Sequence, residues 1–350
     1  MYLEIDGSVG EGGGQILRTS LAMSSLLDKP IKIRNIRSGR RKPGLQAQHL
    51  TCVNALAKIT DAEVRGASIG SQELFFAPKS LKAGDYKFDV SEIKSSAGST
   101  TLIFQAIFLP LAFAGGKSRI TIFGGTHVPW SPPVQYLQMV YLAVAEKMGV
   151  KASIHLKKWG WYPKGGGEIN VEIQPSKIEG VNLSERGTLD STKVISTVSN
   201  LPLSIAQRQQ DQALKTLKSE GINAKSELID APSIGQGTAV FIFTKFGNSY
   251  AGFDALGAKG KRAEQVAEEA CGNCIDFIKS GMSVDPHLAD QLVPLMALAK
   301  GNSCFTTSRI SLHLSTNIQV AETFLPVKFL VSGDEKQPGK VSVDGADFSR

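Results

Sequence analysis

The stretch DPHLADQLVPLMALAKGNSCFTTSRISLHLSTN, residues 285–317, contains the clearest local pattern in the chain. Asp285 is a good helix N-cap, and Pro286 suits a first helical turn. Apolar residues then recur at helical spacing until a Gly-Asn pair. This pattern predicts a helix over residues 286–300.

Alternating apolar and small polar residues follow this helix and predict a strand over residues 309–314. His313 falls within the strand, between two serines, on the face that points away from the core. A neutral imidazole is a competent nucleophile, because its unperturbed pKa is about 6.5. The pattern alone is more typical of a histidine on a solvated strand face, so a nucleophile is the alternative interpretation.

The order strand, helix, strand, helix, strand, strand is expected over residues 2–77 and again over residues 85–173. Residues 286–331 hold a third copy, with its second helix expected over residues 317–325. The second helices look alike: PGLQAQHLTCVNALAK, PPVQYLQMVYLAVAEK and TNIQVAETFL. We therefore predict an α+β fold with three repeated units of two helices packed on a small β-sheet, around a common centre.

A chain of 350 residues is longer than one core usually supports, so we expect two domains. Residues 184–280 have strand and helix patterns of their own and are predicted to form a small inserted α+β domain. The three repeats would then form a discontinuous domain, residues 1–183 and 281–337. Residues 338–350 are expected to be a C-terminal tail, within a stretch that frays from residue 335 onward.

The composition, with 42% hydrophobic and 20% charged residues, is that of an ordinary globular protein. No apolar run reaches the ~20 residues of a membrane span, and the opening MYLEIDGS is not a signal peptide, so we expect a cytoplasmic protein without a membrane partner. The formal net charge of +7 favours an anionic partner. The sequence indicates no oligomeric state.

Cys271 and Cys274 form a C-x-x-C pair, but the second pair or the histidines of a zinc site are missing. Free thiols on a helix are the favoured interpretation, and a redox pair or a local disulfide are the alternatives. In WYPKGGGE, residues 161–168, a turn is predicted. Trp159 and Trp161 are expected to pack in the core, with stacking on RNA bases as the alternative.

The glycine-rich segment GSVGEGGGQILR, residues 7–18, predicts a turn between a strand and a helix, which aims backbone N–H groups at an anion. Its spacing fits neither a dinucleotide fingerprint nor a P-loop. Glu11 in this turn is either a solvated acid or a contact to a metal or a ribose. Further on, residues 37–42 hold three arginines and a lysine, which suit bidentate phosphate recognition or a solvated cationic loop.

Five blocks of the sequence, in order, resemble RNA 3′-terminal phosphate cyclases: GSVGEGGGQILR, IRSGRRKPGLQAQH, SAGSTTLIFQ, HLADQ and SLHLSTN. The resemblance runs from about Leu3 to Val331. It implies a ligase-type enzyme that uses ATP to convert an RNA 3′-phosphate end to a 2′,3′-cyclic phosphodiester. The implied route passes through a covalent histidine–AMP intermediate and an adenylylated RNA 3′ end.

The resemblance also implies roles for single residues, with His313 as the histidine that carries AMP. It implies ATP binding by Gln105, His287, Leu288, Ala289, Asp290 and Gln291, and phosphate or RNA binding by Arg18, Arg37, Arg40, Arg41 and Gln48. Magnesium is expected because the phosphate charge must be neutralised, and Glu11 is its candidate ligand.

Two other functions remain open at this point. One is a non-catalytic, cyclase-like RNA-binding protein that serves ribosome biogenesis. The other is an enzyme like the enolpyruvyl transferases, which use similar repeated units. That class has neither a histidine that carries a nucleotidyl group nor an insert of this size.

Overall fold

The computed structural model describes residues 2–93 and 97–349. Its first unit consists of β1 (Leu3–Asp6), α1 (Gly14–Leu27), β2 (Ile31–Arg34), α2 (Ala47–Thr60), β3 (Glu63–Arg65) and β4 (Leu74–Ala77). The sheet order is β1-β2-β4-β3. β1 and β2 are parallel, and β4 runs antiparallel to both β2 and β3. Both helices therefore start beyond the carboxyl end of a parallel strand.

The second unit has the same sheet, in the order β5-β6-β8-β7 and with the same parallel and antiparallel pairs. Its elements are β5 (Asp85–Asp89), a 3-10 turn η1 (Val90–Glu92), α3 (Thr100–Ala112), β6 (Ser118–Gly124), β7 (Ala152–Lys158) and β8 (Gly167–Ile173). The second helix consists of three consecutive pieces: α4 (Val134–Tyr136), the π-helical η2 (Leu137–Tyr141) and α5 (Leu142–Lys147).

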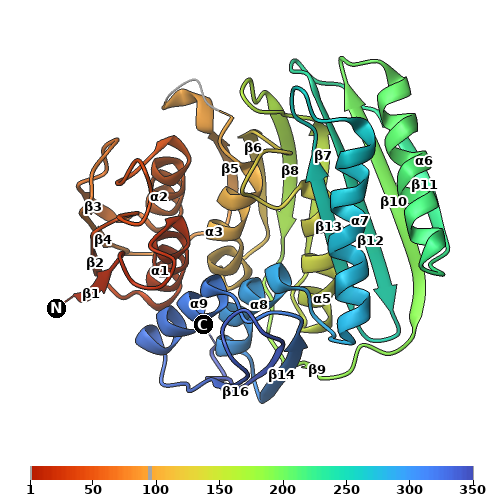
Figure 1. The fold of residues 1–350 in the computed structure, drawn as a ribbon. Helices are drawn as coiled ribbons and strands as arrows, with labels where there is room; N and C mark the ends of the chain where they lie inside the picture. The colour runs from red at the N-terminus through yellow and green to blue at the C-terminus, as the bar shows by residue number, and fades with distance from the viewer. Residues whose placement is uncertain (1, 94–96, 350) are drawn as a thin grey trace.

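The third unit repeats the pattern once more, in the order β9-β14-β16-β15. Its elements are β9 (Asn182–Leu183), α8 (Pro286–Leu298), β14 (Asn302–Thr307), α9 (Leu312–Phe324), β15 (Leu330–Ser332) and β16 (Gly339–Asp344). Three copies of one topology confirm the predicted α+β fold. In Figure 1 the first unit is red to orange, the second runs from orange to yellow-green, and the helices of the third are blue.

The sequence between β9 and α8 adds a fourth sheet, in the order β11-β10-β12-β13. Its elements are β10 (Leu189–Ser199), α6 (Leu203–Ser219), β11 (Ala224–Asp230), β12 (Gly237–Phe246), β13 (Tyr250–Leu256) and α7 (Ala263–Ser280). The helices α6 and α7 pack side by side on this sheet, at the right of Figure 1. Cys271 and Cys274 are buried there as free thiols.

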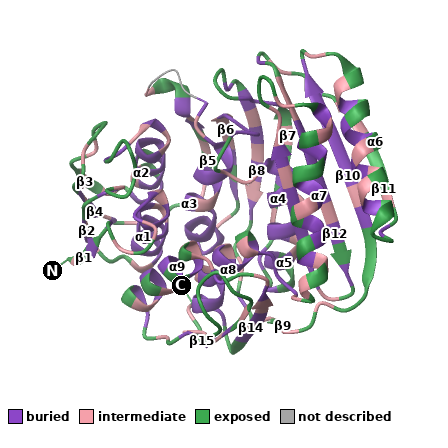
Figure 2. Ribbon diagram, in the orientation of Figure 1, coloured by how far each residue is buried: buried purple, intermediate pink, exposed green. Residues whose placement is uncertain are grey.

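Helix α3 lies at the centre of the three units, where it contacts α1 and α2. Twelve of its thirteen residues are buried, and Gln105 is half-buried. A helix that is apolar on all sides has to be covered on all sides, and Figure 2 shows the buried residues concentrated on α3 and on the inner faces of its neighbours. In the part of the chain that the structure describes, no helix is both long and apolar enough to cross a membrane.

The predicted strand over residues 309–314 is wrong, because His313 is the second residue of helix α9. Ser311 is the N-cap, and its Oγ accepts a hydrogen bond from the N–H of Leu314 at 3.1 Å. A serine side chain that caps the first turn starts a helix even where apolar residues alternate. The second helix of the third unit therefore begins five residues before the predicted start at residue 317.

The prediction that the chain frays from residue 335 onward is also wrong for most of that stretch. β16 lies between β14 and β15, and its Val341 and Val343 are buried. The polar run GDEKQPGK is not part of a frayed tail, because it forms the hairpin that leads into this strand. The alternation of valine with polar residues after it is the pattern of a half-buried strand.

Candidate active site

The glycine-rich turn between β1 and α1 lies against the start of α9. The N–H of Glu11 donates to Thr316 Oγ1 at 3.2 Å. Gly10 has φ +63° and approaches Thr316 so closely that a Cβ at this position would overlap the threonine hydroxyl. Glycine is therefore required both for the backbone conformation and for the close approach of the two segments. This contact joins the first and third units.

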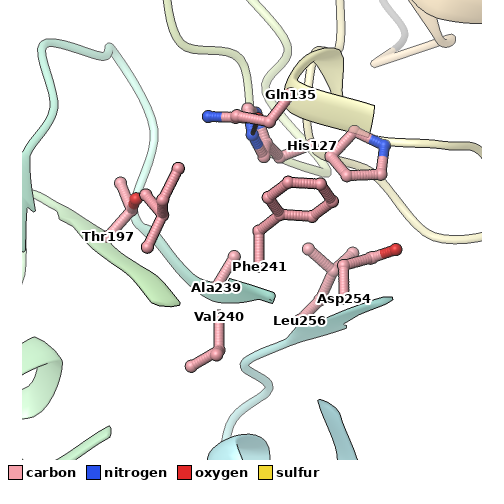
Figure 3. A pocket seen from close by; sticks show the side chains of 10 residues that line it. His127, Gln135, Thr197, Ala239, Val240, Phe241, Asp254 and Leu256 are labelled. Carbon is pink, nitrogen blue, oxygen red and sulfur yellow. Dashed lines mark hydrogen bonds between the residues drawn. The ribbon is translucent and has the colours of Figure 1, made fainter. Parts of the chain in front are cut away.

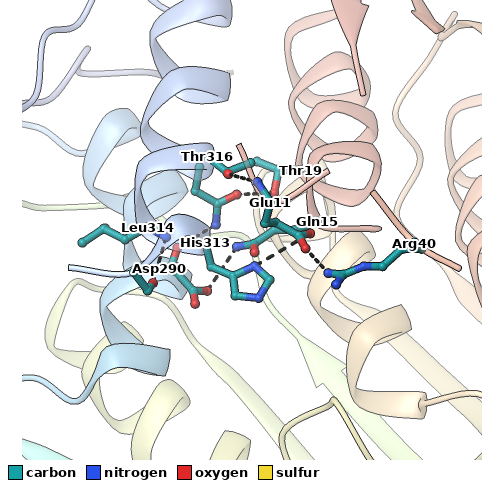
Figure 4. A network of polar contacts seen from close by, with 10 residues as sticks. Glu11, Gln15, Thr19, Arg40, Asp290, His313, Leu314 and Thr316 are labelled. Carbon is teal, nitrogen blue, oxygen red and sulfur yellow. Dashed lines mark hydrogen bonds and ion pairs between the residues drawn. The ribbon is translucent and has the colours of Figure 1, made fainter. Parts of the chain in front are cut away.

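Glu11 forms the centre of a polar network shown in Figure 4. Its side chain is only 7% exposed, and its Oε2 is ion-paired with the guanidinium of Arg40. Its other oxygen, Oε1, lies 3.8 Å from Nδ1 of His313. Among the described residues, neither Oε1 nor Nδ1 has a hydrogen-bond partner. The two atoms face each other at slightly more than hydrogen-bond distance.

His313 is held as a neutral imidazole. Burial, followed by the positive charges of Arg18 and Arg40, lowers its pKa to about 4. Its position in the first turn of α9 adds the positive end of a helix dipole, which also disfavours protonation. A neutral ring that holds its proton on Nδ1, toward Glu11, carries a free lone pair on Nε2.

Asp290 on α8 and Asn317 on α9 connect three helices. Burial raises the pKa of Asp290 to about 8, although Gln15 Nε2 donates to its Oδ1 at 3.2 Å. The Asn317 amide donates to the backbone carbonyl of Asp290 at 2.8 Å, and Thr19 Oγ1 donates to Asn317 Oδ1 at 2.8 Å. Helices α1, α8 and α9 are thereby fixed relative to one another by buried hydrogen bonds.

The start of α8 is fixed by the buried carboxylate of Asp285. Its Oδ1 accepts hydrogen bonds from the backbone N–H groups of His287 and Leu288, and both of its oxygens lie within 3.0 Å of Tyr136 Oη. In the HLADQ segment, the side chains of Leu288 and Ala289 are buried in the core. Polar side chains are offered by the exposed His287 and by Asp290 and Gln291.

The arginine-rich loop after β2 contains two kinds of side chain. Arg37 has φ +54°, and its Nη1 donates to the carbonyls of Lys42 and Gly44, both at 2.8 Å, so this guanidinium braces its own loop. Arg40 and Arg41 are both exposed, but Arg40 is ion-paired with Glu11. The cations predicted to bind phosphate thus differ in how freely they can move.

His49 was missed as a site residue and lies beside Arg18, at the start of α1. Its Nδ1 accepts a hydrogen bond from the N–H of Gln46 at 3.3 Å, and its Nε2 closely approaches Gly14. Burial, followed by the charges of Arg18, Arg37 and Arg40, lowers its pKa well below the usual value. The sequence feature that could have indicated a role for His49 is its position. It is the third residue of a helix capped by Gln46, and this helix directly follows the cationic loop.

Gln48 and Gln105 have different surroundings. Gln48 Oε1 accepts a hydrogen bond from the N–H of Ser99 at 3.0 Å, which joins the start of α2 to the start of α3. Gln105 is half-buried on α3 and, within the described chain, makes no side-chain hydrogen bond to Glu11, Asp290 or His313. The network in Figure 4 therefore does not include it.

A magnesium site made of protein ligands alone is not present in residues 2–93 and 97–349, because no three His, Cys, Asp or Glu side chains gather there. Magnesium, however, requires only one or two carboxylates when phosphates and water complete its shell. Glu11 Oε1 is buried and without a hydrogen-bond partner in this part of the chain, so its lone pairs are free. The site fits a magnesium ion that arrives with a nucleotide.

Comparison with known proteins identifies the family. The family model described as RNA 3′-terminal phosphate cyclase matches residues 9–331. The chain belongs to this family of enzymes. It is 44% identical to the RNA 3′-terminal phosphate cyclase of Trichormus variabilis, over 95% of this chain and 97% of that protein. It is 42% identical to the protein of the same name from Staphylothermus marinus, over 99% of both chains.

One solved structure with an overlapping fold is the enolpyruvyl transferase NikO from Streptomyces tendae. The overlay covers 98% of this chain and 49% of that chain, with 10% identity and a TM-score of 0.40. A similarity this weak supports no inference about function. The family assignment rests on the sequence relatives, as the five resembling blocks predicted.

Proposed function

We propose that this cyclase-family chain uses ATP to convert an RNA 3′-phosphate end to a 2′,3′-cyclic phosphodiester, with His313 as the nucleophile. The observation that carries the proposal is the state of His313. It is a neutral imidazole that faces the Glu11 carboxylate across 3.8 Å and stands at a helix start among arginines. A solvated surface histidine would need none of these features.

In the first step, Nε2 of His313 attacks the α-phosphorus of ATP. A P–N bond forms, the bond from the α-phosphorus to the bridging oxygen breaks, and pyrophosphate leaves. The Nδ1–H group of the ring faces Glu11. The Glu11 carboxylate orients the ring and stabilises the positive charge that develops on it during the attack, as a carboxylate does for a histidine general base. Covalent catalysis of this kind replaces one difficult displacement with easier ones.

In the second step, an oxygen of the RNA 3′-phosphate attacks the phosphorus of the AMP group. The P–N bond breaks, His313 is regenerated, and the RNA end becomes adenylylated. The 2′-hydroxyl then attacks the 3′-phosphorus, its proton is lost to solvent, and AMP leaves as the cyclic phosphodiester closes. Only the terminal ribose and its phosphate take part in bond changes, so the chemistry requires no base sequence.

The charge of the phosphates would be met by Arg18 and Arg40 and by the first-turn N–H groups of α1 and α9. Arg41 is exposed and Arg37 is held by its own loop, so we assign them weaker phosphate contacts. Positioned charge of this kind supplies most of the rate in phosphoryl and nucleotidyl transfer.

The nucleoside end of ATP would lie along the start of α8. His287 and Gln291 offer exposed or half-exposed polar groups there, and Asp290 offers a carboxyl that burial keeps protonated at neutral pH. A protonated carboxyl can donate a hydrogen bond without repelling the phosphates. Gln105 and Gln48 would complete this side of the site from α3 and α2.

A magnesium ion bound with ATP would be held by Glu11 and would supply charge neutralisation at the phosphates. Glu11 can serve both the ion and His313, because a carboxylate has about four lone-pair positions. Its ion pair with Arg40 fixes the carboxylate in place for either role.

The alternative is an RNA-binding protein of the same family without catalysis. It would need neither the lowered pKa of His313 nor the pairing of that ring with Glu11. The ion pair between the buried Glu11 carboxylate and the exposed Arg40, beside an imidazole whose Nδ1 has no hydrogen-bond partner among the described residues, therefore favours an enzyme.

The test is incubation with [α-32P]ATP and magnesium, followed by a denaturing gel and acid treatment. We expect an acid-labile label on the wild type and none on His313→Ala. His155→Ala is the matched control, because His155 is exposed on β7, and it should be labelled normally. Label that remains on His313→Ala would reject His313 as the nucleophile. An unlabelled wild type that still binds RNA would favour the non-catalytic alternative.

A further inference from the structure

Three loops that contact one another expose large apolar side chains. They are residues 125–133, 159–166 and 231–237. The N–H groups of Thr126 and His127 donate to the carbonyl of Gly160, and the N–H of Trp159 donates to the carbonyl of Pro232. The loops are therefore joined by backbone hydrogen bonds. On their outer side stand Trp130, Tyr162 and Ile234, with 97%, 68% and 63% of their surfaces exposed.

Below this surface the loops are packed rigidly. His127 stacks on Trp159, with ring centroids 4.2 Å apart, and lies tilted against Trp161, with centroids 5.1 Å apart. Both tryptophans are buried, as predicted. His127 Nε2 bonds to Gln135 Oε1 at 2.6 Å, and burial lowers the pKa of His127 to about 3. The hollow that remains there, shown in Figure 3, has a volume of about 10 Å³, which is space for one water at most.

Trp130 is held outward by its own backbone. It has φ +60°, a conformation that a bulky residue rarely adopts. Ser131 Oγ donates to the carbonyl of Val128 at 3.0 Å, and Thr101 Oγ1 donates to the carbonyl of Pro132 at 2.8 Å, so the loop is fixed on both sides of the indole. A strained backbone that displays a fully exposed aromatic ring indicates a binding role for that ring.

A short series of contacts leads from Trp130 to the arginines. Thr101 Oγ1, which holds the loop through Pro132, also bonds to Ser99 Oγ at 2.7 Å. The N–H of Ser99 donates to Gln48, and the next residue, His49, lies beside Arg18. The repeated topology also gives residues 125–133 the position in the second unit that the arginine loop has in the first. They follow β6, the second strand of their unit, as the arginine loop follows β2.

We propose that Trp130 and Tyr162 stack on the bases of the nucleotides that precede the 3′-phosphate end of a single-stranded RNA. The proposal rests on the proposed function, which places the terminal phosphate at Arg18 and Arg40. Aromatic faces next to cationic side chains are how proteins hold single strands without reading their sequence. The positive charge for the RNA backbone comes from Lys164, whose side chain is exposed. Its Nζ lies 3.5 Å from the carbonyl oxygen of Ile234, one of the exposed apolar residues.

The position of the three tryptophans makes the proposal directly measurable. Trp159 and Trp161 are buried, so Trp130 is the tryptophan of this chain that a bound base can quench. We would titrate the protein with 3′-phosphorylated RNA of two and of twelve nucleotides and follow tryptophan fluorescence and anisotropy. The twelve-nucleotide RNA should quench the wild type, and Trp130→Phe should remove the quenching but retain most of the affinity.

Trp130→Ala should bind the twelve-nucleotide RNA roughly tenfold more weakly, the loss expected for one base–aromatic stack. Tyr162→Ala should act in the same direction, while Leu330→Ala, which removes an exposed apolar residue on β15, should not. Binding of the dinucleotide and the rate of self-adenylation from ATP should stay unchanged. Melting temperatures of all variants would establish that they are folded.

The outcomes separate this proposal from the proposed function. Unchanged affinity of Trp130→Ala for the long RNA would overturn the stacking surface while leaving the cyclase reaction intact. An equal loss of ATP affinity would also overturn it, because the ring would then belong to the nucleotide site. Failure of the wild type to adenylate itself or to cyclise RNA would instead reject the proposed function.

Discussion

The first and second units share one topology but place opposite chemistry in equivalent loops. After β2, residues 35–46 carry Arg37, Arg40 and Arg41. After β6, residues 125–133 carry a buried His127, which stacks on Trp159 and contacts Trp161, and an exposed Trp130. The strands and helices fix where each loop lies, and the loop residues alone decide what it can bind.

A histidine of the second unit and a histidine of the third show how one residue type acquires different roles. His127 and His313 both have a lowered pKa, at about 3 and about 4. Both ring nitrogens of His127 have partners, Thr126 and Gln135, so its lone pair is used. His313 Nδ1 faces Glu11 without a hydrogen bond, and the proposed function assigns the attack on ATP to its Nε2. A lowered pKa alone therefore does not identify a nucleophile.

The largest effect should come from Arg40→Ala. This change removes the partner of the buried Glu11 carboxylate and a cation from the proposed phosphate site. We expect self-adenylation to slow by about 10²- to 10³-fold, the loss typical of a positioned charge, as measured with radiolabelled ATP. Arg119→Ala is the matched change in the second unit, because Arg119 is an exposed, ion-paired residue of β6, and its rate should stay normal. Equal rates for the two variants would break the comparison between the units.

Part of this arrangement could be predicted from the sequence and part could not. The cap formed by Asp285 and Pro286 is local, so helix α8 was predicted closely. The position of His313 was assigned to a strand because apolar alternation and a serine-capped helix start look alike over six residues. The pairing of His313 with Glu11 joins residues about 300 positions apart, and no local pattern reports it.

The arginine loop shows the same limit on a smaller scale. Its composition predicted phosphate contacts, but it did not reveal that Arg37 is used by the carbonyls of Lys42 and Gly44. The sequence did not predict a function for the loop around Trp130, because it does not show whether a tryptophan is exposed or buried. Burial depends on the packing of distant segments, which the three repeats supply.

A moderate effect is expected from Asn317→Ala. The change leaves Thr19 Oγ1 without its acceptor and the Asp290 carbonyl without its donor in a buried place. We expect the free energy of unfolding to fall by about 1–3 kcal/mol, as measured by urea titration. Asn54→Ala is the control, because Asn54 is exposed on α2 and should change the stability little. Equal stabilities would mean that the contact between α1, α8 and α9 does not depend on this amide.

The smallest effect at neutral pH is expected from Asp290→Asn, which resembles the protonated carboxyl. Because burial raises the pKa of Asp290 to about 8, its contribution to stability is complete below about pH 4 and is lost as the pH rises through 8. The wild type should therefore lose melting temperature relative to Asp290→Asn as the pH rises from about 4 to about 8, and no further above that. Its adenylation rate should fall relative to that of the variant as the pH passes about 8, where the Asp290 carboxyl becomes charged.

His127→Gln provides the contrast from the second unit. The pKa of His127 at about 3 keeps its ring neutral over the whole range, so this variant should follow the pH profile of the wild type. Measurements of melting temperature and self-adenylation between pH 6 and 9.5 would check both variants. Parallel profiles for the wild type and Asp290→Asn would show that Asp290 does not titrate near pH 8.

The insertion of a whole sheet between β9 and α8 has a consequence for synthesis. β9 is made early, yet its partner β14 begins at Asn302, and β16, in the middle of the same sheet, begins at Gly339. At about 5–20 residues per second, the ribosome needs roughly ten seconds between these strands. The helix that carries His313 has no completed sheet to rest on until β16 has been made, so the proposed site cannot be complete in a nascent chain before that point.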